Sequence, residues 1–412
     1  MKFIFIHQNF PAQYVHLAPK LISLGHHCIA IGSRHIKESK SITTIKYSIN
    51  LPEKKGYKNL HPWVLDMHSK CLRAEAVAKK LLKIKKQGFI PDLIIGHSGW
   101  GELIAVKDIF PNTPILNYFE FIYQISGADI NFDDEFSQKD WFEDVKIRIK
   151  RYPHLMTLHD MDHAIAPTKW QASSAPEIYS KKISIIHEGI DTNKIKPNKD
   201  AFLYLKKADL KFTSKDQIIT YVARNLEPYR GFHIFMRMLP ILQQLNPNCH
   251  VIIVGGDSVS YGNPPSNGMT WRSYLLEELQ GKLDLSKIHF VGYVPHQTLH
   301  NLFQVSSCHV YLTYPFILSW SLLEAMSCGA IVVGSDTEPL REVIIDNENG
   351  FLVNFFDYSA LANKVSNILK NKDEYEFIKI NARKTITENY DLHNICLPKQ
   401  LKLITSIIKK KN

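Results

Sequence analysis

Apolar runs without strict alternation recur along the whole chain, and segments with helical periodicity lie between them. In the first half, these runs cover residues 2–7, 28–32, 92–97, 114–119 and 163–167. Continuous rather than alternating apolar strands are typical of a parallel sheet that helices cover on both faces. The pattern therefore predicts an α/β fold.

The same rhythm restarts after residue 200, with apolar runs at residues 218–223, 251–256, 288–292, 309–313, 330–335 and 351–355. A chain of 412 residues is too long for one compact core. We predict two doubly wound, Rossmann-like domains, residues 1–195 and 196–390. We expect a last helix, within residues 391–412, to pack back on the first domain.

Residues 121–153 break this rhythm, because the segment is long, rich in aromatic residues, and acidic before it becomes basic. Long irregular insertions after a strand often form lids or substrate-binding loops. A surface insertion without a function is the alternative.

The chain has a formal net charge of +10, with basic runs at residues 54–58, at 79–86 and at the C-terminus. Solvated helix faces explain such runs. Attraction to an anionic surface, either membrane headgroups or phosphorylated substrates, is the alternative. Nucleic acid is not expected as a partner, because the basic residues do not interleave with aromatic residues and no known binding module occurs.

The six cysteines are scattered and form no CxxC pair, which favours reduced thiols over a disulfide framework or a zinc cage. The N-terminal apolar stretch is too short for a signal peptide, and no apolar run approaches 18 residues. We therefore expect a cytoplasmic protein. No GxGxxG follows the first strand, and no P-loop, HExxH, GxSxG or EF-hand pattern occurs.

The segment "YVARNLEPYRGF" (221–232) places Arg224 just past a predicted strand and Arg230 at the start of a helix. Two guanidinium groups near a helix N-terminus suit a pyrophosphate, because they neutralise its charge and bond in a bidentate way. The next strand ends in "VIIVGGD", where Gly255 and Gly256 let the backbone approach a ligand at the carboxyl edge of the sheet. Exposed arginines that cap loops, and a tight turn, are the alternatives.

The segment "FILSWSLLEAMSCGAIVVGSDTEPLREVI" (316–344) contains one carboxylate in its apolar first half. Ser321 and Glu324 match the S-x-x-E capping box, and Gly329 is placed to end the helix in a left-handed conformation. Capping is therefore one interpretation of Glu324. In the other, the helix N-terminus binds phosphate and the carboxylate accepts hydrogen bonds from ribose hydroxyls.

Together with "IIHEGID", "HFVGYVP" and "NENGFLV", these motifs resemble the retaining GT-B glycosyltransferases of family 4, in order and spacing over nearly the whole chain. The resemblance implies a first domain that binds the acceptor and a second that binds a nucleotide-sugar donor across a cleft. It implies no cofactor and no metal, with a UDP-sugar as the expected donor substrate.

The resemblance also implies roles for residues of the second domain. Arg224 and Arg230 would hold the diphosphate, and Glu324, as the second glutamate of E-x7-E, would hold the ribose. Further donor-binding residues would be Gly255, Gly256 and Asp257 after one strand, Tyr293 and Val294 beside the base, and Ile317, Leu318 and Ser319 facing the sugar and phosphate.

Three departures from the family pattern stand out. Phe316 occupies the position of the first E-x7-E glutamate, and the glycine-containing loop of the first domain reads Pro11, Ala12, Gln13. Glu120 replaces a histidine that often follows the fifth strand. We therefore expect Glu120, and after it His97, to assist catalysis, with His7, Gln8, Pro11 and Ala12 on the acceptor side; each could instead be structural.

The resemblance implies transfer with retention at the anomeric carbon, by front-face attack with the leaving phosphate as base. The acceptor would be a lipid-linked or protein-linked saccharide, as in surface polysaccharide or glycoconjugate assembly, and the protein would make peripheral contact with the inner membrane face. Phe316 leaves open a degenerate chain that only binds a nucleotide, an acceptor or a partner. A nucleotide-sugar epimerase is the third hypothesis.

Overall fold

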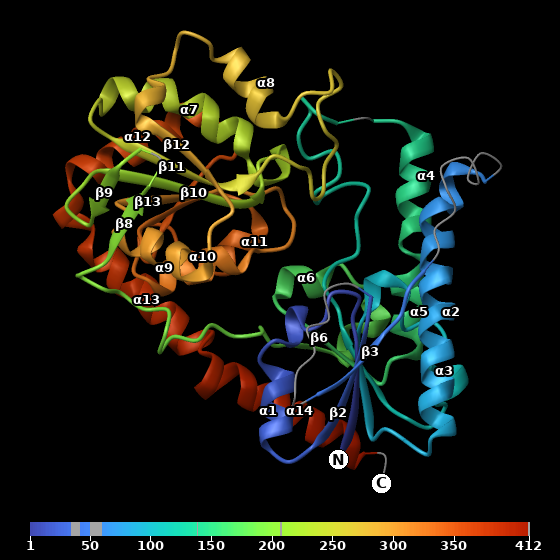
Figure 1. The fold of residues 1–412 in the computed structure, drawn as a ribbon. Helices are drawn as coiled ribbons and strands as arrows, with labels where there is room; N and C mark the ends of the chain where they lie inside the picture. The colour runs from blue at the N-terminus through green and yellow to red at the C-terminus, as the bar shows by residue number, and fades with distance from the viewer. Residues whose placement is uncertain (34–41, 50–59, 138, 207, 411–412) are drawn as a thin grey trace. The chain divides into compact units, whose positions relative to one another are not determined.

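A computed structural model describes residues 1–33, 42–49, 60–137, 139–206 and 208–410. The predicted basic run at 54–58 lies outside the described residues. The chain forms two compact units, of which unit 1 comprises residues 1–189 and 393–412, and unit 2 comprises residues 190–392. Each unit has its own parallel sheet (Figure 1).

Unit 1 is built on a seven-stranded sheet with the order β3-β2-β1-β4-β5-β6-β7, in which every pair is parallel. The strands are β1 (Lys2–Ile6), β2 (His27–Gly32), β3 (Thr43–Lys46), β4 (Leu93–His97), β5 (Ile115–Tyr118), β6 (His163–Ala166) and β7 (Ile183–Ile185). All residues of β4 and β5 are buried, which confirms the two-sided covering that their apolar runs predict.

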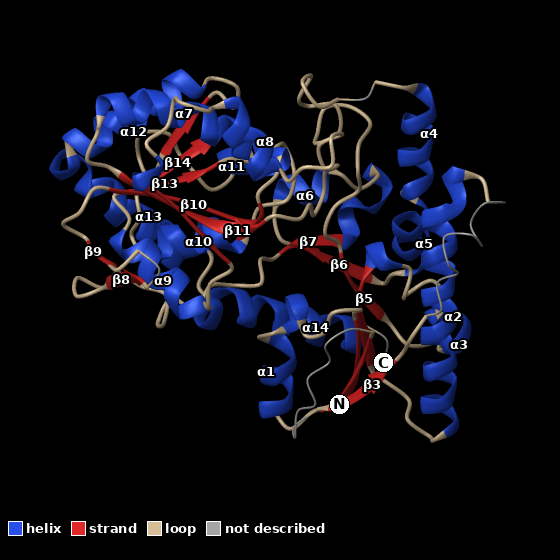
Figure 2. Ribbon diagram, turned by 45° about the horizontal axis from the view of Figure 1, so that its top comes forward, coloured by secondary structure: helices blue, strands red, loops and turns tan. Residues whose placement is uncertain are grey.

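The helices of unit 1 cover both faces of this sheet (Figure 2). They are α1 (Leu17–Ser23), α2 (Leu65–Lys86), α3 (Val106–Ile109), α4 (Trp141–Lys150), α5 (Tyr152–Asp160), α6 (Lys169–Ser173) and α14 (Leu397–Lys409). The buried stripe of α2, with Val77, Leu81 and Ile84, packs on Ile4 and Ile94 of the sheet. The predicted last helix forms as α14, and its Gln400 side chain donates to the His187 carbonyl at 3.1 Å.

Unit 2 has a six-stranded parallel sheet with the order β12-β11-β10-β13-β14-β15. Its strands are β10 (Ile218–Asn225), β11 (His250–Gly256), β12 (Ile288–Gly292), β13 (Cys308–Tyr311), β14 (Val332–Ser335) and β15 (Phe351–Val353). An antiparallel hairpin of β8 (Phe202–Leu205) and β9 (Leu210–Thr213) precedes the sheet. The periodicity did not predict this hairpin.

The helices of unit 2 also lie on both faces of its sheet (Figure 1). They are α7 (Phe232–Leu245), α8 (Trp271–Glu278), α9 (His296–Val305), α10 (Trp320–Ser327), α11 (Glu338–Arg341), α12 (Tyr358–Lys370) and α13 (Glu376–Asn389). None of the helices in the described ranges is long and apolar enough to span a bilayer.

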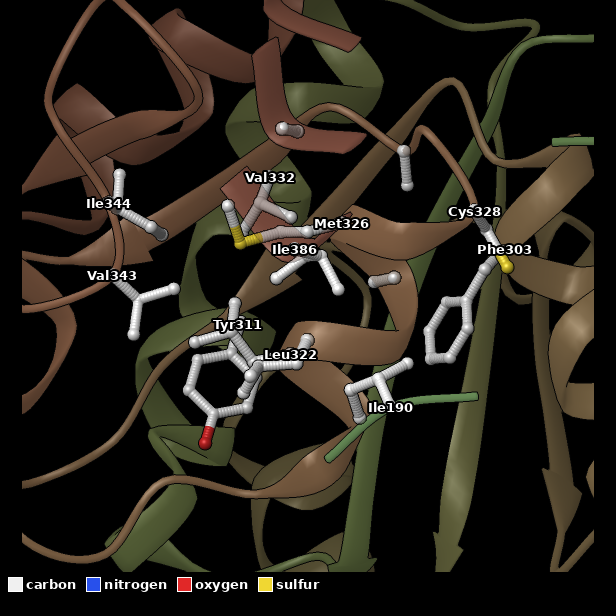
Figure 3. Close-up of a cluster of buried hydrophobic side chains, with 14 of the residues drawn as sticks. Ile190, Phe303, Tyr311, Leu322, Met326, Cys328, Val332, Val343, Ile344 and Ile386 are labelled. Carbon is white, nitrogen blue, oxygen red and sulfur yellow. The ribbon is translucent and has the colours of Figure 1, made fainter. Parts of the chain in front are cut away.

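Helix α10 is fixed in place by the core of unit 2. Its Leu322 and Met326 point into the same apolar cluster as Tyr311, Val332 and Ile386 (Figure 3). Leu322 is fully buried, and truncating such a leucine to alanine typically lowers the free energy of unfolding by about 2–5 kcal/mol. The N-terminus of α10 is therefore held rigidly at the carboxyl edge of the sheet.

The end of α10 confirms one local prediction. Gly329 has φ of +76°, and its N–H donates to the Met326 carbonyl at 3.0 Å. Only glycine adopts this left-handed conformation without a steric penalty, so Gly329 ends the helix as expected.

Candidate functional site

The predicted donor residues of unit 2 gather at the carboxyl ends of its strands. Arg224 lies near the end of β10, Gly256 ends β11 and Tyr293 follows β12. Open α/β sheets bind their ligands at this edge. The geometry there divides the predicted residues into those that the protein already engages and those that it leaves available.

Arg230 is engaged by the protein. It ends the short helix η6 (Pro228–Arg230) and is only 8% exposed. Its Nη1 donates to Thr313 Oγ1 and to the Ile317 carbonyl, both at 2.9 Å, and reaches the Tyr311 hydroxyl at 3.4 Å. The alternative of an exposed loop arginine is therefore wrong for Arg230, which ties the β13–α10 loop to η6. Arg224, in contrast, is exposed.

Phe316 takes the place of a carboxylate beside Arg230. The side chain is 3% exposed, and its ring packs at 68° on Tyr261 with a centroid distance of 4.9 Å. The Arg230 guanidinium lies 5.4 Å from the Tyr261 ring centroid and 6.0 Å from that of Phe316. Aromatic faces stabilise a cation without neutralising it, so the positive charge of Arg230 is retained here.

The N-terminus of α10 corrects one prediction. Ser319, not Ser321, is the N-cap, and its side chain accepts from the Ser321 N–H at 3.3 Å. Ser321 lies inside the helix, so the S-x-x-E capping box does not form. The Ser319 N–H donates to the Tyr311 hydroxyl at 2.7 Å, which connects the helix start to the loop held by Arg230.

Glu324 consequently has no capping role. It is 6% exposed, and no hydrogen bond to its carboxylate occurs among the described residues. Burial raises the pKa of this carboxyl group, with His296 acting weakly in the opposite direction. A carboxylate that is largely removed from water and has no donor among the described residues is costly to keep charged.

The glycine pair at the end of β11 is explained by its neighbours. A Cβ atom on Gly256 would lie 2.3 Å from the Tyr293 hydroxyl, which donates to Asn225 Oδ1 at 2.8 Å. Tyr293 itself is 69% exposed and covers this strand end. Asp257 forms an ion pair with Arg272 at 2.7 Å, and the Val294 side chain packs against an apolar cluster.

Glu227 is a residue of this edge that the sequence interpretation missed. It is 1% exposed and accepts from the backbone N–H groups of Ser260, Tyr261 and Gly262 at 2.9–3.1 Å. Glu227 thereby holds the loop that presents Tyr261 to Arg230. The sequence did carry a signal for this residue, because Glu227 lies between the two arginines that are predicted to bind phosphate. A negative charge there would repel phosphate, so the glutamate indicates a different role.

Unit 1 has a second polar cluster at the carboxyl ends of β1, β4 and β5. His97 ends β4, is 2% exposed, and stacks between the rings of Trp100 and Tyr118. Its Nδ1 accepts from the Gly99 N–H at 3.0 Å, so the proton of the neutral ring lies on Nε2. That Nε2 lies 3.3 Å from Glu120 Oε2 and donates to it.

The environment of Glu120 determines its charge. Burial pushes its pKa upwards, but the hydrogen bond from His97 and the fields of His97 and His7 outweigh burial, and the net pKa is lowered. Glu120 is therefore ionised at neutral pH. Gln13 Nε2 approaches the other carboxylate oxygen at 3.4 Å. Glu120 suits hydrogen-bond acceptance or the stabilisation of positive charge rather than proton donation.

His7 presents a free donor to the same cluster. Its Nδ1 accepts from the Asn9 N–H at 3.0 Å, which places the ring proton on Nε2, a buried atom with no protein partner in the described chain. Burial, with the field of His97, lowers the pKa of His7 to about 3. His7 is therefore a neutral donor at physiological pH.

The remaining acceptor-side residues form the loop after β1. The Gln8 N–H donates to Glu102 Oε2 at 3.2 Å, and Glu102 also accepts from the Tyr47 hydroxyl. Ala12 has φ of +41°, a left-handed conformation that L-residues rarely adopt, in the turn after Pro11. The sequence interpretation missed Glu102, whose carboxylate fixes this loop from 94 residues away.

The segment 121–153 contributes to a pocket of unit 1 with a volume of about 470 Å³. Arg151 lines it, and its Nε donates to the Tyr123 carbonyl at 2.9 Å. Trp170 and Phe121 stack beside it at an interplanar angle of 29°. Because Ile122 of this segment belongs to the same buried cluster as Phe119 and Leu158, at least part of the segment packs against the unit 1 fold.

Comparisons with known proteins agree with these observations. Residues 24–195 match the glycosyl transferase family 4 group, and residues 205–385 match the glycosyl transferases group 1. An uncharacterized glycosyltransferase of Methanocaldococcus jannaschii is 26% identical over 216 residues, which are 52% of this chain and 50% of that protein. The chain spans about half the length, or less, of the curated relatives it matches.

Solved structures show the same fold. Sucrose-phosphate synthase from Thermosynechococcus elongatus matches with a TM-score of 0.73 at 17% identity, and the match covers 100% of this chain and 100% of that one. Anabaena HepE in complex with UDP-glucose has a TM-score of 0.65 at 16% identity, over 98% of this chain and 100% of that one. Both predictions, of two Rossmann-like domains and of the family, are confirmed. The two models together match most of the sequence, and the chain belongs to the group 1 glycosyltransferases of the family 4 group.

Proposed function

We propose that the protein transfers a sugar, with retention, from a nucleoside-diphosphate sugar to an acceptor hydroxyl, and that unit 2 binds the donor. The observation that carries this proposal is the buried carboxylate of Glu324, which has no donor in the described protein and lies one turn inside a helix with a rigidly held N-terminus. The vicinal hydroxyls of a ribose supply the two missing hydrogen bonds.

The charge that develops on the leaving diphosphate is stabilised by three features of unit 2. Arg224 is exposed and available, Arg230 holds the loop before α10 in place, and the α10 N-terminus offers backbone N–H groups. Preorganised donors of this kind act without reorganisation during the reaction. These groups supply positive charge for the transition state, and we propose that the transfer needs no metal.

Unit 1 binds the acceptor in this proposal. Ionised Glu120 stabilises the positive charge that develops at the sugar, while the attacking hydroxyl passes its proton to the leaving phosphate. His97 orients Glu120, and His7 Nε2 donates to a substrate oxygen. The pocket lined by Arg151, Trp170 and Phe121 combines a cation with aromatic faces, which suits a saccharide with an anionic group.

The donor is proposed to be a UDP-sugar, and the acceptor a lipid-linked or protein-linked saccharide of surface polysaccharide or glycoconjugate assembly. HepE, which has a similar fold, is known in complex with UDP-glucose. The net charge of +10 supports contact with an anionic membrane on the cytoplasmic side. Salt-dependent binding to vesicles that contain phosphatidylglycerol tests this last point, and binding that does not change with salt contradicts it.

One specific observation favours a second candidate. Phe316 fills the position of the glutamate that contacts the donor sugar in the resembling family. A chain that binds nucleotide without transferring sugar, or one that epimerises a nucleotide sugar, would tolerate this change.

Incubation of the protein with a panel of nucleotide sugars, with and without acceptor saccharides, separates these functions. Transfer predicts release of the nucleoside diphosphate that depends on the acceptor. An epimerase forms product from the donor alone, and a binding protein shows neither reaction. In a parallel thermal-unfolding screen, a donor at 100 times its Kd adds about 2.7 kcal/mol of stability. If no nucleotide sugar shifts unfolding, the proposed donor site is wrong.

A further inference from the structure

Three metal-ligating side chains of unit 2 converge where α9 meets α10. His296 and His300 lie one turn apart on α9, and Glu324 lies on α10. One ligand atom from each residue lies within 4.8 Å of the other two. The two imidazole rings are 6.2 Å apart between centroids, with an interplanar angle of 64°.

The protein leaves the two inner members of this cluster without partners. His300 Nε2 is buried and makes no hydrogen bond with any described residue. The Glu324 carboxylate, 6% exposed, likewise has no donor in the part of the chain that the structure describes. His296, the third member, is exposed. A buried imidazole nitrogen without a partner, close to a carboxylate that accepts no hydrogen bond from the described residues, indicates a bound group rather than a solvated surface pair.

The chemistry of the three ligands selects a class of ion. Two imidazole nitrogens and one carboxylate oxygen are the ligand set of open zinc sites, whereas Mg²⁺ and Ca²⁺ prefer oxygen ligands only. With metal–ligand distances of about 2.0–2.2 Å, tetrahedral ligand atoms lie about 3.3 Å apart. A rotamer change of exposed His296 can bring its ring nitrogen closer to the other two ligands. Water would complete the coordination.

We propose that His296, His300 and Glu324 form a site for a zinc-class transition-metal ion. Because Glu324 is also the residue that we propose holds the ribose, the ion and the nucleotide exclude each other. The ion is therefore an inhibitor of donor binding and takes no part in transfer. This second statement rests on the proposed function, whereas binding of the ion does not.

Ion binding is tested with the untagged full chain after removal of metals by a chelator. Titration with Co²⁺ is followed by visible absorption, and titration with Zn²⁺ by calorimetry. One ion per chain is expected. His296→Gln and His300→Gln are each expected to lose at least tenfold in affinity, because loss of even an indirect ligand partner costs about 10–100-fold.

The matched control is His289→Gln. His289 Nε2 lies 2.9 Å from His250 Nδ1, and no third ligand for this histidine pair occurs among the described residues. Its removal is expected to leave affinity for the ion unchanged. The site is wrong if the wild-type protein binds no stoichiometric ion, or if His296→Gln, a change at an exposed position that folding tolerates, binds as tightly as wild type.

Competition tests the second statement. Zn²⁺ at saturation is expected to raise the apparent Kd of UDP at least tenfold in the wild-type protein, and to leave it unchanged in His296→Gln. UDP binding that Zn²⁺ does not weaken contradicts exclusion at Glu324. An ion that binds to a protein without affinity for any nucleotide supports the metal site and contradicts the proposed donor site instead.

Discussion

The carboxyl edges of the two sheets differ in how the protein stabilises their buried charged side chains. In unit 1, Glu120 is already hydrogen-bonded by His97, and the nearby His7 ring is buried and neutral. In unit 2, Arg230 is satisfied by its own protein, while Glu324 is buried with no donor in the described residues. The first edge holds a carboxylate that is already hydrogen-bonded by the protein. The second edge holds a carboxylate that has no hydrogen-bond donor among the described residues and that hydroxyl groups of a ligand would satisfy.

This difference indicates a division of labour. A preorganised carboxylate contributes in the transition state, because it does not have to move when charge develops. An unsatisfied carboxylate contributes to binding, because the ligand removes its cost. Changes in unit 1 should therefore act mainly on kcat, and changes at Glu324 mainly on nucleotide affinity.

The largest effect is expected from Glu120→Gln. The amide keeps the size of the side chain but removes the negative charge that stabilises the transition state, so kcat should fall about 10³-fold, the upper end of the scale for one preorganised group. The Kd of UDP should stay unchanged. Initial rates and calorimetry measure the two quantities, with Glu75→Gln, an exposed carboxylate of α2, as the control. A variant with normal turnover would remove Glu120 from the mechanism.

Arg230→Ala should lower kcat about 10²–10³-fold, because the loop before α10 loses its anchor and the diphosphate loses positive charge. Arg237→Ala is the matched control, since Arg237 pairs with Glu278 on the surface of the same unit. Arg230→Lys sharpens the result, because lysine keeps the charge but loses the planar donor geometry. Equal rates for Arg230→Ala and the control would contradict the proposed role.

Acid should destabilise unit 1 through its buried histidines. Burial, with the field of His97, lowers the pKa of His154 to about 3, so the unfolded chain binds more protons between about pH 3 and 6.5. The contribution of His154 to the free energy of unfolding is therefore complete above pH 6.5 and is lost as the pH falls towards 3. Between pH 7 and pH 5 this one group contributes about 2 kcal/mol of the loss.

Urea unfolding at pH 7 and at pH 5 measures this loss of stability. His154→Gln should lose about 2 kcal/mol less than the wild-type protein between pH 7 and pH 5. His159→Gln, a change at an exposed position of the same helix, should lose as much as wild type. An identical loss in all three proteins would show that His154 is not held neutral by the fold.

The smallest effect is expected from Glu324→Gln in the absence of nucleotide. Since burial raises the pKa of Glu324, its charged form is unfavourable in the folded state and costs stability once the pH exceeds that pKa. The amide removes this cost and should raise the Tm by about 2–4 °C, equivalent to about 1 kcal/mol. Saturating UDP should reverse the order of the two proteins. Glu338→Gln, at an exposed position, is the control.

The features that could be predicted from the sequence are those that a few neighbouring residues encode. The buried strands follow from continuous apolar runs, and the end of α10 follows from Gly329. The capping box failed for the same reason, because a four-residue pattern does not include the Tyr311 hydroxyl that fixes the N-terminus at Ser319. The sequence likewise carries no strong periodicity for the β8–β9 hairpin.

Long-range partners were the features that could not be predicted. Glu102 meets Tyr47 across 55 residues, and Glu227 meets the loop at 260–262 across 33 or more. Neither pairing leaves a local signal in one sequence. Phe316 was recognised as a departure from the family pattern, but the aromatic contact with Tyr261 that accounts for it depends on the fold.

The central claim is that Glu324 holds the ribose of a nucleotide, and a comparison of UDP with 2′-deoxy-UDP tests it most directly. Calorimetry on the wild-type protein and on Glu324→Gln gives four values of Kd. Loss of the 2′-hydroxyl should weaken binding to the wild-type protein about tenfold, the scale of a hydrogen bond to a charged group, and should have little effect on Glu324→Gln. The same ratio in both proteins would show that Glu324 does not contact the ribose.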